Sequence, residues 1–148
     1  MEREKFMREA LRLAESAAEA GEVPVGCVIV GSNGEILGRG RNRREERHDA
    51  TAHAEIEAIR EACAAAGDWR LSESTIYVTL EPCPMCTGAI IAARIPNVVF
   101  AVRDEMTGAC GSVIDLFSEN FRHRAAVYPG VCGEESRTLL QRFFAVRR

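Results

Sequence analysis

The stretch TIYVTLEPCPMC, residues 75–86, decides the fold class that we expect for this chain. Thr75 to Leu80 is rich in β-branched residues and predicts a buried strand. A helix is expected from Cys83 to about Ala93, because Pro84 then falls in the first turn, where its missing N–H would have no partner anyway. Val98 to Val102 predicts the next strand. A strand, a helix and a second strand in direct succession are typical of an α/β fold.

The segments on either side extend this pattern over the whole chain. The turn Gly31-Ser32-Asn33-Gly34 predicts a hairpin between the two strands that flank it. We find no internal repeat and no linker, so residues 1–148 are predicted to form a single domain. The expected architecture is a three-layer α/β/α sandwich around a mixed sheet of roughly five strands. The remaining predicted elements are helices at Arg3 to Ala20, Ala52 to Ala66 and Glu134 to Ala145, strands at Val25 to Val30, Glu35 to Arg41 and Val127 to Val131, and a short helical turn within Ser112 to Phe117.

The composition is that of a globular protein outside the membrane. The chain has 148 residues, of which 47% are hydrophobic and 28% are charged. These values are ordinary for a soluble domain with one core. No apolar run approaches the length of a membrane span, and the N-terminal stretch MEREKFMREA is too charged for a secretory signal. We therefore expect a cytoplasmic protein without membrane contact.

The sequence contains six cysteines, which raises the question of disulfides. Without a secretion signal, reduced thiols are the better expectation. Cys27, Cys63, Cys110 and Cys132 stand in small-residue or apolar neighbourhoods and are predicted to be buried core thiols. The remaining two cysteines are then available for chemistry.

Cys83, Cys86 and His53 are the residues whose types and spacing predict a metal site. Two thiols three residues apart lie on one face of a helix and can hold one ion. The positive end of a helix also lowers the pKa of a thiol and favours the thiolate that a metal binds. His53 stands at the start of another expected helix, with Asp49 or Thr51 as its expected N-cap. An imidazole and two thiolates are three strong zinc ligands, and a catalytic zinc site leaves the fourth position to water.

Glu55 follows His53 by two residues, where a hydrolytic zinc site needs a proton carrier. H-x-E together with P-C-x-x-C is the signature of the zinc nucleobase deaminases, in which the glutamate is the general acid and base rather than a ligand. Zinc would activate a water there, and Glu55 would carry its proton to the ring and then to the departing amine. Two alternatives are a redox dithiol at Cys83 and Cys86, and an RNA-binding protein that zinc merely stabilises. The intact Glu55 argues against the latter.

Further blocks of the sequence match one known family over nearly the whole chain. They are Glu22–Gly26, Gly40–Arg43, Arg47–Glu55, Tyr77–Cys83, Arg103–Asp104, Thr107–Ser112, Leu139–Leu140 and Phe143–Phe144. In these blocks the chain resembles the bacterial tRNA-specific adenosine deaminases of the cytidine-deaminase-like superfamily. The resemblance implies the cytidine-deaminase-like fold, one Zn²⁺ per subunit and a homodimer. It also implies that the substrate is the wobble adenosine of a tRNA anticodon stem-loop, which becomes inosine.

The resemblance assigns roles around the substrate as well. Asn42 would hydrogen-bond the target nucleotide, Ala54 would contact the base through its backbone, and Val25 would line the pocket. Asp104 would approach a ribose hydroxyl beside the target, and Phe144 would pack on a flanking nucleotide, as aromatic side chains do with unpaired bases. The alternative for Asp104 is a carboxylate that caps a turn. The alternative for Phe144 is a core residue of the last helix.

Charge is distributed locally rather than overall. The formal net charge is −3, so no global field draws the protein to phosphate. Arginines nevertheless gather beside the metal motif and near the C-terminus, where they are either RNA-backbone contacts or solvated loop charges. Met106, Arg122 and Ala145 depart from the usual family pattern, and all three lie where the RNA would run. The candidate RNA-backbone contacts are Arg43, Arg44, Arg47, Arg122, Arg147 and Arg148.

We therefore predict a zinc-dependent hydrolase that deaminates adenosine to inosine in tRNA. The alternative is a deaminase of a free nucleobase or nucleoside, such as guanine, cytosine or a modified purine, because relatives use the same H-x-E chemistry. A homodimer is also expected from the Cys83 helix itself. Residues 88–93 of that helix are apolar most of the way round, and such a helix needs a second partner besides the sheet.

Overall fold

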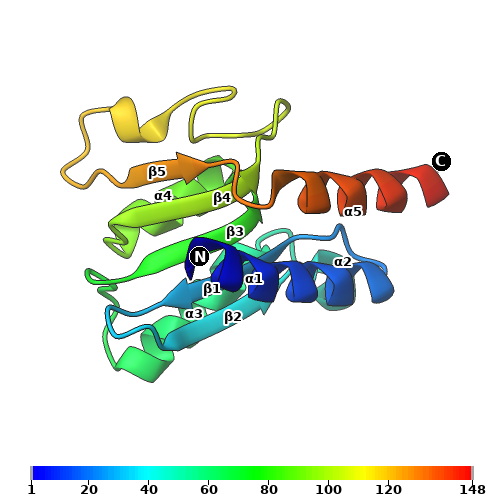
Figure 1. The fold of residues 1–148 in the computed structure, drawn as a ribbon. Coiled ribbons are helices and arrows are strands. Elements are labelled where there is room, and N and C mark those ends of the chain that lie inside the picture. Colours follow the sequence, from blue (N-terminus) through cyan, green and yellow to red (C-terminus); the bar gives the residue numbers. More distant parts are fainter. Residues whose placement is uncertain (1, 148) are drawn as a thin grey trace.

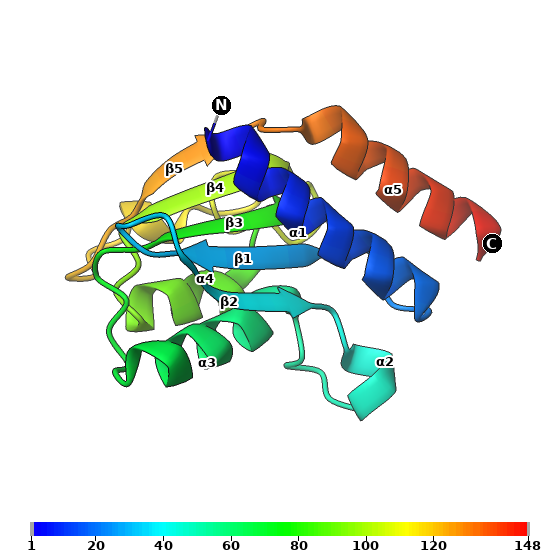
Figure 2. The same cartoon turned by 60° about the horizontal axis from the view of Figure 1, so that its bottom comes forward.

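A mixed five-stranded sheet lies between two layers of helices (Figure 1). The structure is a computed structural model that describes residues 2–147. Its elements are α1 (Glu2–Glu19), β1 (Gly26–Val30), β2 (Ile36–Arg41), α2 (Arg44–Arg47), α3 (Ala54–Ala66), β3 (Thr75–Leu80), α4 (Pro84–Ala92), β4 (Asn97–Val102), the 3₁₀ turn η1 (Leu116–Ser118), β5 (Ala126–Pro129) and α5 (Gly133–Val146). Figure 2 shows α1 and α5 on one face of the sheet and α3 and α4 on the other. The predicted three-layer α/β/α sandwich is confirmed.

The strand order β2-β1-β3-β4-β5 combines two kinds of pairing. β1 pairs antiparallel with both β2 and β3, so the predicted hairpin forms. β3, β4 and β5 are parallel to one another. In the parallel part, connecting helices start where strands end, and α4 therefore begins directly after β3. This edge of the sheet, where the parallel strands finish, is where α/β proteins bind ligands.

Two apolar clusters fill the space on either side of the sheet. Side chains alternate along each strand, so Val28 of β1 packs in a cluster with Phe6 and Met7 of α1. Its neighbour Ile29 belongs to the cluster on the α3 and α4 side. Among the described residues, no helix is both long enough and apolar enough to cross a bilayer.

Glycines of β2 let α3 approach the sheet very closely. A Cβ atom at Gly40 would lie 2.2 Å from the backbone oxygen of Ala54, and one at Gly38 would lie 2.3 Å from that of Ala58. Because only glycine fits there, the backbone of α3 packs directly on β2. This contact fixes the N-terminus of α3, and with it His53, against the sheet.

The structure corrects several of the predicted details. The short helix α2 was not expected from the sequence. His53 itself is the N-cap of α3, whereas Asp49 accepts hydrogen bonds from the N–H and hydroxyl of Thr51 at 2.8 and 2.7 Å. The prediction of Asp49 or Thr51 as N-cap is therefore wrong. Cys63 and Cys132 are only partly buried, while Cys27 and Cys110 are buried as predicted, and all four are free thiols.

Candidate functional site

A pocket of about 520 Å³ opens where β3 ends and α3 and α4 begin. His53, Glu55 and Cys83 line its floor, and three segments form its walls. The first wall contains Val23, Val25, Asn42 and Arg44, the second runs from Arg103 to Thr107, and the third contributes Leu140 and Phe144 from α5. The pocket therefore unites segments that lie far apart in the sequence.

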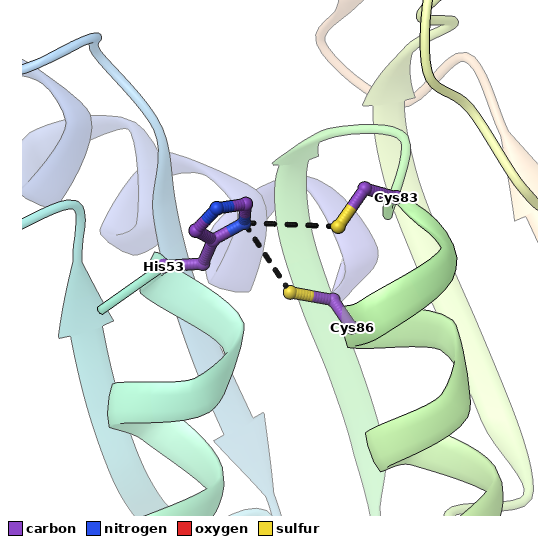
Figure 3. A group of neighbouring side chains, drawn as sticks. All are labelled: His53, Cys83 and Cys86. Atoms are coloured by element: carbon purple, nitrogen blue, oxygen red, sulfur yellow. Dashed lines mark hydrogen bonds between the residues drawn. The ribbon is translucent and has the colours of Figure 1, made fainter. Parts of the chain in front are cut away.

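His53 and Cys83 occupy equivalent places at the N-termini of two adjacent helices. Each is an N-cap with extended backbone, and Pro84 follows Cys83 at the first position of α4, as predicted. Figure 3 shows the imidazole of His53 facing both thiols across the gap between the helices. His53 Nδ1 lies 3.7 Å from Cys83 Sγ and 3.5 Å from Cys86 Sγ. The three residues predicted as ligands are thus brought together.

The spacing of these three atoms fits a zinc ion. The three ligand atoms lie within 4.8 Å of one another. Zn–N bonds of about 2.0 Å and Zn–S bonds of about 2.3 Å at tetrahedral angles require an N···S separation of about 3.5 Å. The observed N···S distances of 3.5 and 3.7 Å are close to this value. Among the described residues, this is the group whose side chains could hold a metal ion, and it leaves one corner of a tetrahedron for water.

The pKa values of the two thiols also favour the binding of a cation. A hydrogen bond from Cys86, with a further contribution from His53, lowers the pKa of Cys83 to about 4. The Cys83 sulfur and burial together raise the pKa of Cys86 well above its usual value. In the protein alone, one thiol of the pair is therefore ionised near neutral pH and the other is not. A bound divalent cation would stabilise both as thiolates.

Glu55 lies beside this cluster without belonging to the ligand set. It is the second residue of α3, and only 4% of its surface is exposed. Burial raises the pKa of Glu55 from 4.5 to about 7. A carboxyl group with a pKa near the working pH can both take up and release a proton, as a general acid–base catalyst must.

Asn42 and Ala54 form a linked pair behind the metal ligands. The Asn42 side chain accepts a hydrogen bond from the Ala54 N–H at 3.1 Å and donates one to the Val23 carbonyl at 3.0 Å. Asn42 and Val25 line the pocket as expected, whereas Ala54 is fully buried and is not among the lining residues. The side chain of Asn42 thus accepts the hydrogen bond from the first N–H of α3, a role that the sequence led us to expect from a nearer residue.

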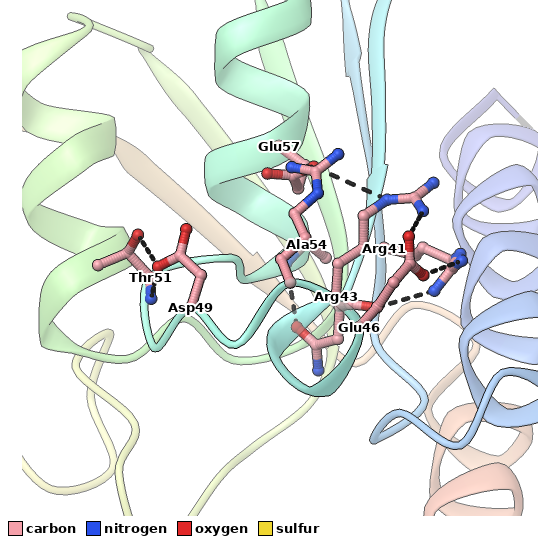
Figure 4. A network of polar contacts seen from close by, with 9 residues as sticks. Arg41, Arg43, Glu46, Asp49, Thr51, Ala54 and Glu57 are labelled. Carbon is pink, nitrogen blue, oxygen red and sulfur yellow. Dashed lines mark hydrogen bonds and ion pairs between the residues drawn. The ribbon is translucent and has the colours of Figure 1, made fainter.

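The arginines of this region are largely paired with carboxylates. Arg47 lies 2.6 Å from Glu57, and Arg43 lies 2.9 Å from Glu46 and 3.7 Å from Glu57. Arg41 contacts Glu46 from the other side at 2.9 Å, and Figure 4 shows Arg41, Arg43, Glu46 and Glu57 close to Ala54. The ion pairs of Arg43 and Arg47 therefore stabilise the loop that leads to His53.

The other candidate arginines lie in three different settings. Arg44 lines the pocket. Arg122 lies in the exposed loop before β5, and the guanidinium of Arg147 stacks 3.7 Å from the centre of the Phe143 ring. Arg148 lies outside the described residues. Arg44 is therefore the candidate that borders the metal cluster.

Asp104 and Phe144, for which the sequence left alternatives open, both line the pocket. Asp104 accepts hydrogen bonds from the N–H groups of Met106 and Thr107 at 3.0 and 3.2 Å, so its carboxylate caps a turn while lining the pocket. Phe143 is the core residue of the aromatic pair, whereas Phe144 is 47% exposed at the pocket mouth. Met106 stands 85% exposed on the facing wall.

Two buried glutamates near the pocket were missed by sequence reasoning. Glu22 accepts hydrogen bonds from the N–H groups of Glu45 and Glu46 at 3.1 and 2.8 Å and thereby caps α2. Glu81, directly before the P-C-P-M-C run, binds backbone groups of residues 104–112. Both side chains are 2% exposed. The feature of the sequence that could have identified them is an acidic residue next to an apolar run, which indicates a buried carboxylate with hydrogen-bond donors around it.

Comparisons with known proteins agree with this site. Residues 1–102 match the family described as cytidine and deoxycytidylate deaminase zinc-binding region. The chain is 48% identical to the tRNA-specific adenosine deaminase of Bacillus subtilis (strain 168) over 142 residues, 95% of this chain and 88% of that protein. It is similar to a solved tRNA:A34 deaminase, studied for A-to-I editing at the wobble position of transfer RNA, with a TM-score of 0.89 and 44% identity over 92% of this chain and 99% of that one. A guanine deaminase from Bacillus subtilis is similar with a TM-score of 0.66 and 35% identity over 97% of this chain and 92% of that one.

Proposed function

The chain belongs to the family defined by the cytidine and deoxycytidylate deaminase zinc-binding region and, within it, to the tRNA-specific adenosine deaminases, and we propose that it hydrolyses the 6-amino group of the wobble adenosine in a tRNA anticodon loop. The products are inosine and ammonia. The observation that carries this proposal is the buried Glu55 next to a three-ligand metal site inside a pocket whose walls extend to the exposed Phe144.

His53, Cys83 and Cys86 would hold Zn²⁺, which when bound lowers the pKa of a water molecule in the open position. Glu55 takes a proton from the attacking water as its oxygen bonds to C6 of adenine, and delivers it to the ring nitrogen N1. It then carries a second proton to the amino group as the C6–N bond breaks. Glu55 thus serves first as a base and then as an acid.

The walls of the pocket are proposed to select a nucleotide within a loop. Asn42 offers a side-chain amide to the target, supported from behind by Ala54. Val25 packs against the base, and Asp104 lies within reach of a neighbouring ribose while it caps its turn. Phe144 and Arg44 also line the pocket, and we expect them to contact a flanking base and a phosphate. Such remote contacts orient the reacting atom and favour a macromolecular substrate over a free base.

We also propose that the functional unit is a homodimer. Met85 and Ala92 of α4 are exposed and Ala89 is half-buried, so the helix presents apolar surface away from the sheet. Val113 and Ile114 add two exposed apolar side chains on the loop that follows Ala109, and the Ala109 N–H donates to the Pro82 carbonyl beside α4. Light scattering at micromolar protein should give about twice the 16.3 kDa mass of the chain. A monomer would contradict the dimer and leave the deaminase proposal standing.

Incubation of the zinc-loaded protein with two anticodon stem-loops tests the proposed reaction. One carries adenosine at the wobble position, and the other carries adenosine only elsewhere in the loop. We expect inosine and ammonia in equal amounts from the first alone, and none with Glu55→Gln. Rapid release of ammonia from free guanine, with the stem-loop untouched, would instead identify a free-base deaminase, the function named for the relative that is 35% identical.

A further inference from the structure

Glu81 is a buried carboxylate that borders the pocket and that the proposed chemistry does not use. It follows β3, and its own N–H continues the parallel ladder by donating to the Val102 carbonyl at 2.9 Å. Its backbone is therefore held between two central strands. Cys83, a zinc-ligand candidate, follows two residues later. Whatever the Glu81 side chain binds is thus fixed to the end of β3, next to β4.

The partners of Glu81 all come from one loop. Oε1 accepts from the Asp104 N–H at 3.0 Å, and Oε2 accepts from the N–H groups of Cys110 and Ser112 at 2.9 and 3.1 Å. The Ser112 hydroxyl donates to Oε1 as well. These four hydrogen bonds occupy both oxygens of the carboxylate and stabilise its charge, so the Glu81 side chain is committed to this loop.

The loop fits closely around this carboxylate. A Cβ atom at Gly108 would lie 2.4 Å from Glu81 Cδ, so only glycine allows the chain to pass there. Ala109 is joined to Pro82 by a 2.8 Å backbone hydrogen bond, and the Cys110 thiol lies 3.5 Å from the Thr87 hydroxyl of α4. The loop is therefore wrapped around the strand end that leads into the metal ligands.

The same loop provides a wall of the pocket. Residues 104–107 line it. The Asp104 carboxylate caps the turn of this segment, and the Asp104 N–H donates a hydrogen bond to Glu81. We propose that Glu81 is a positioning residue that fixes the wall formed by residues 104–107 relative to the zinc ligands, and so sets how well the enzyme binds the nucleotides around its target. The effect on substrate use rests on the proposed function, whereas the ordering of the loop does not.

Glu22 offers a matched control on the opposite wall. It is equally buried, and it too accepts from backbone N–H groups, those of Glu45 and Glu46. Glu81→Gln and Glu22→Gln therefore make the same chemical change at two different walls. In each variant an amide NH₂ replaces an acceptor oxygen and faces N–H donors, which loses hydrogen bonds to a charged group.

Amide hydrogen exchange of the zinc-loaded proteins tests the ordering without any substrate. In Glu81→Gln, exchange within residues 104–112 should accelerate roughly 10- to 100-fold, as expected for lost hydrogen bonds to a charged group, with residues 44–46 unchanged. Glu22→Gln should give the reverse pattern. Unchanged exchange in residues 104–112 of Glu81→Gln would overturn the proposal. If that variant does not fold, Ser112→Ala removes one donor and keeps the carboxylate; it should accelerate exchange of the same segment, and no change there would equally overturn the proposal.

Steady-state kinetics on the wobble-adenosine stem-loop distinguish two roles of Glu81, positioning of the wall formed by residues 104–107 and support of the zinc ligands. If the wall is correctly formed only about one tenth of the time, the apparent dissociation constant of the substrate rises about tenfold. In Glu81→Gln, KM should therefore rise, while kcat changes by less than about threefold. The variant should retain its zinc. Loss of zinc with a fall in kcat at constant KM would mean that Glu81 only supports Cys83, and would overturn the proposal. If the wild-type protein does not deaminate the stem-loop at all, the proposed function fails while the exchange result still decides the role of Glu81 in the loop.

Discussion

Glu55→Gln should stabilise the metal-free protein, and it should abolish the activity of the zinc-loaded protein. Burial raises the pKa of Glu55 from 4.5 to about 7. Between these two pH values the unfolded chain has lost the proton that the folded protein keeps. Stability therefore falls as the pH rises through this window, and remains lower above it.

The size of the effect follows from the width of the window. It spans roughly 2.5 pH units, each worth about 1.4 kcal/mol, so the ionised Glu55 costs the folded metal-free protein about 3 kcal/mol above pH 7. Glutamine has nearly the same shape and no charge to bury. The variant should thus match the wild type at pH 4.5 and exceed it by about 3 kcal/mol at pH 8.

Urea unfolding of chelator-treated, reduced protein at a series of pH values measures this difference directly. Glu15→Gln, at an exposed position of α1, separates burial from the mere loss of a carboxylate and should change stability little at either pH. Equal stability of wild type and Glu55→Gln at pH 8 would show that Glu55 bears no burial penalty, and the reasoning about its proton affinity would be wrong.

Two other outcomes follow from the site. The purified protein should contain about one zinc per chain, as a three-ligand open site requires, and Cys83→Ser should lose most of it when measured by elemental analysis; full zinc in that variant would mean that the metal is held elsewhere. Phe144→Ala should reduce kcat/KM for the stem-loop by the equivalent of about 1–3 kcal/mol, the usual loss for one stacking aromatic, with little change for a free nucleoside. Val146→Ala, also exposed on α5 but absent from the pocket lining, is its control, and equal losses in the two variants would contradict a stacking role for Phe144.

The sequence predicts the central strand and the metal ligands well because their causes are local. Thr75–Leu80 is β-branched and apolar and is followed by proline, and the observed strand has these same bounds. The thiols and imidazole were identified by residue type and spacing, and the helix N-termini then bring them together.

Features that depend on distant partners could not be predicted in this way. The helix α2 has four residues, and a carboxylate twenty-odd positions earlier, Glu22, caps it. The first N–H of α3 likewise donates to Asn42, directly after β2, rather than to the nearer Asp49. Arg43 and Arg47, two of the candidate RNA-backbone contacts, are paired with Glu57 of α3, and the sequence did not indicate this pairing. Each case requires knowing which elements lie side by side.

The central claim is that the pocket deaminates an adenosine held within an RNA loop. The most direct measurement compares kcat/KM for the wobble-adenosine stem-loop with the values for free adenosine, adenine, guanine and cytosine, at low and raised salt. We predict at least about a hundredfold preference for the stem-loop, since flanking stacking and phosphate contacts are absent from the free compounds, and a steep decline of that preference with salt. Faster turnover of any free base than of the stem-loop, with no dependence on salt, would contradict the account.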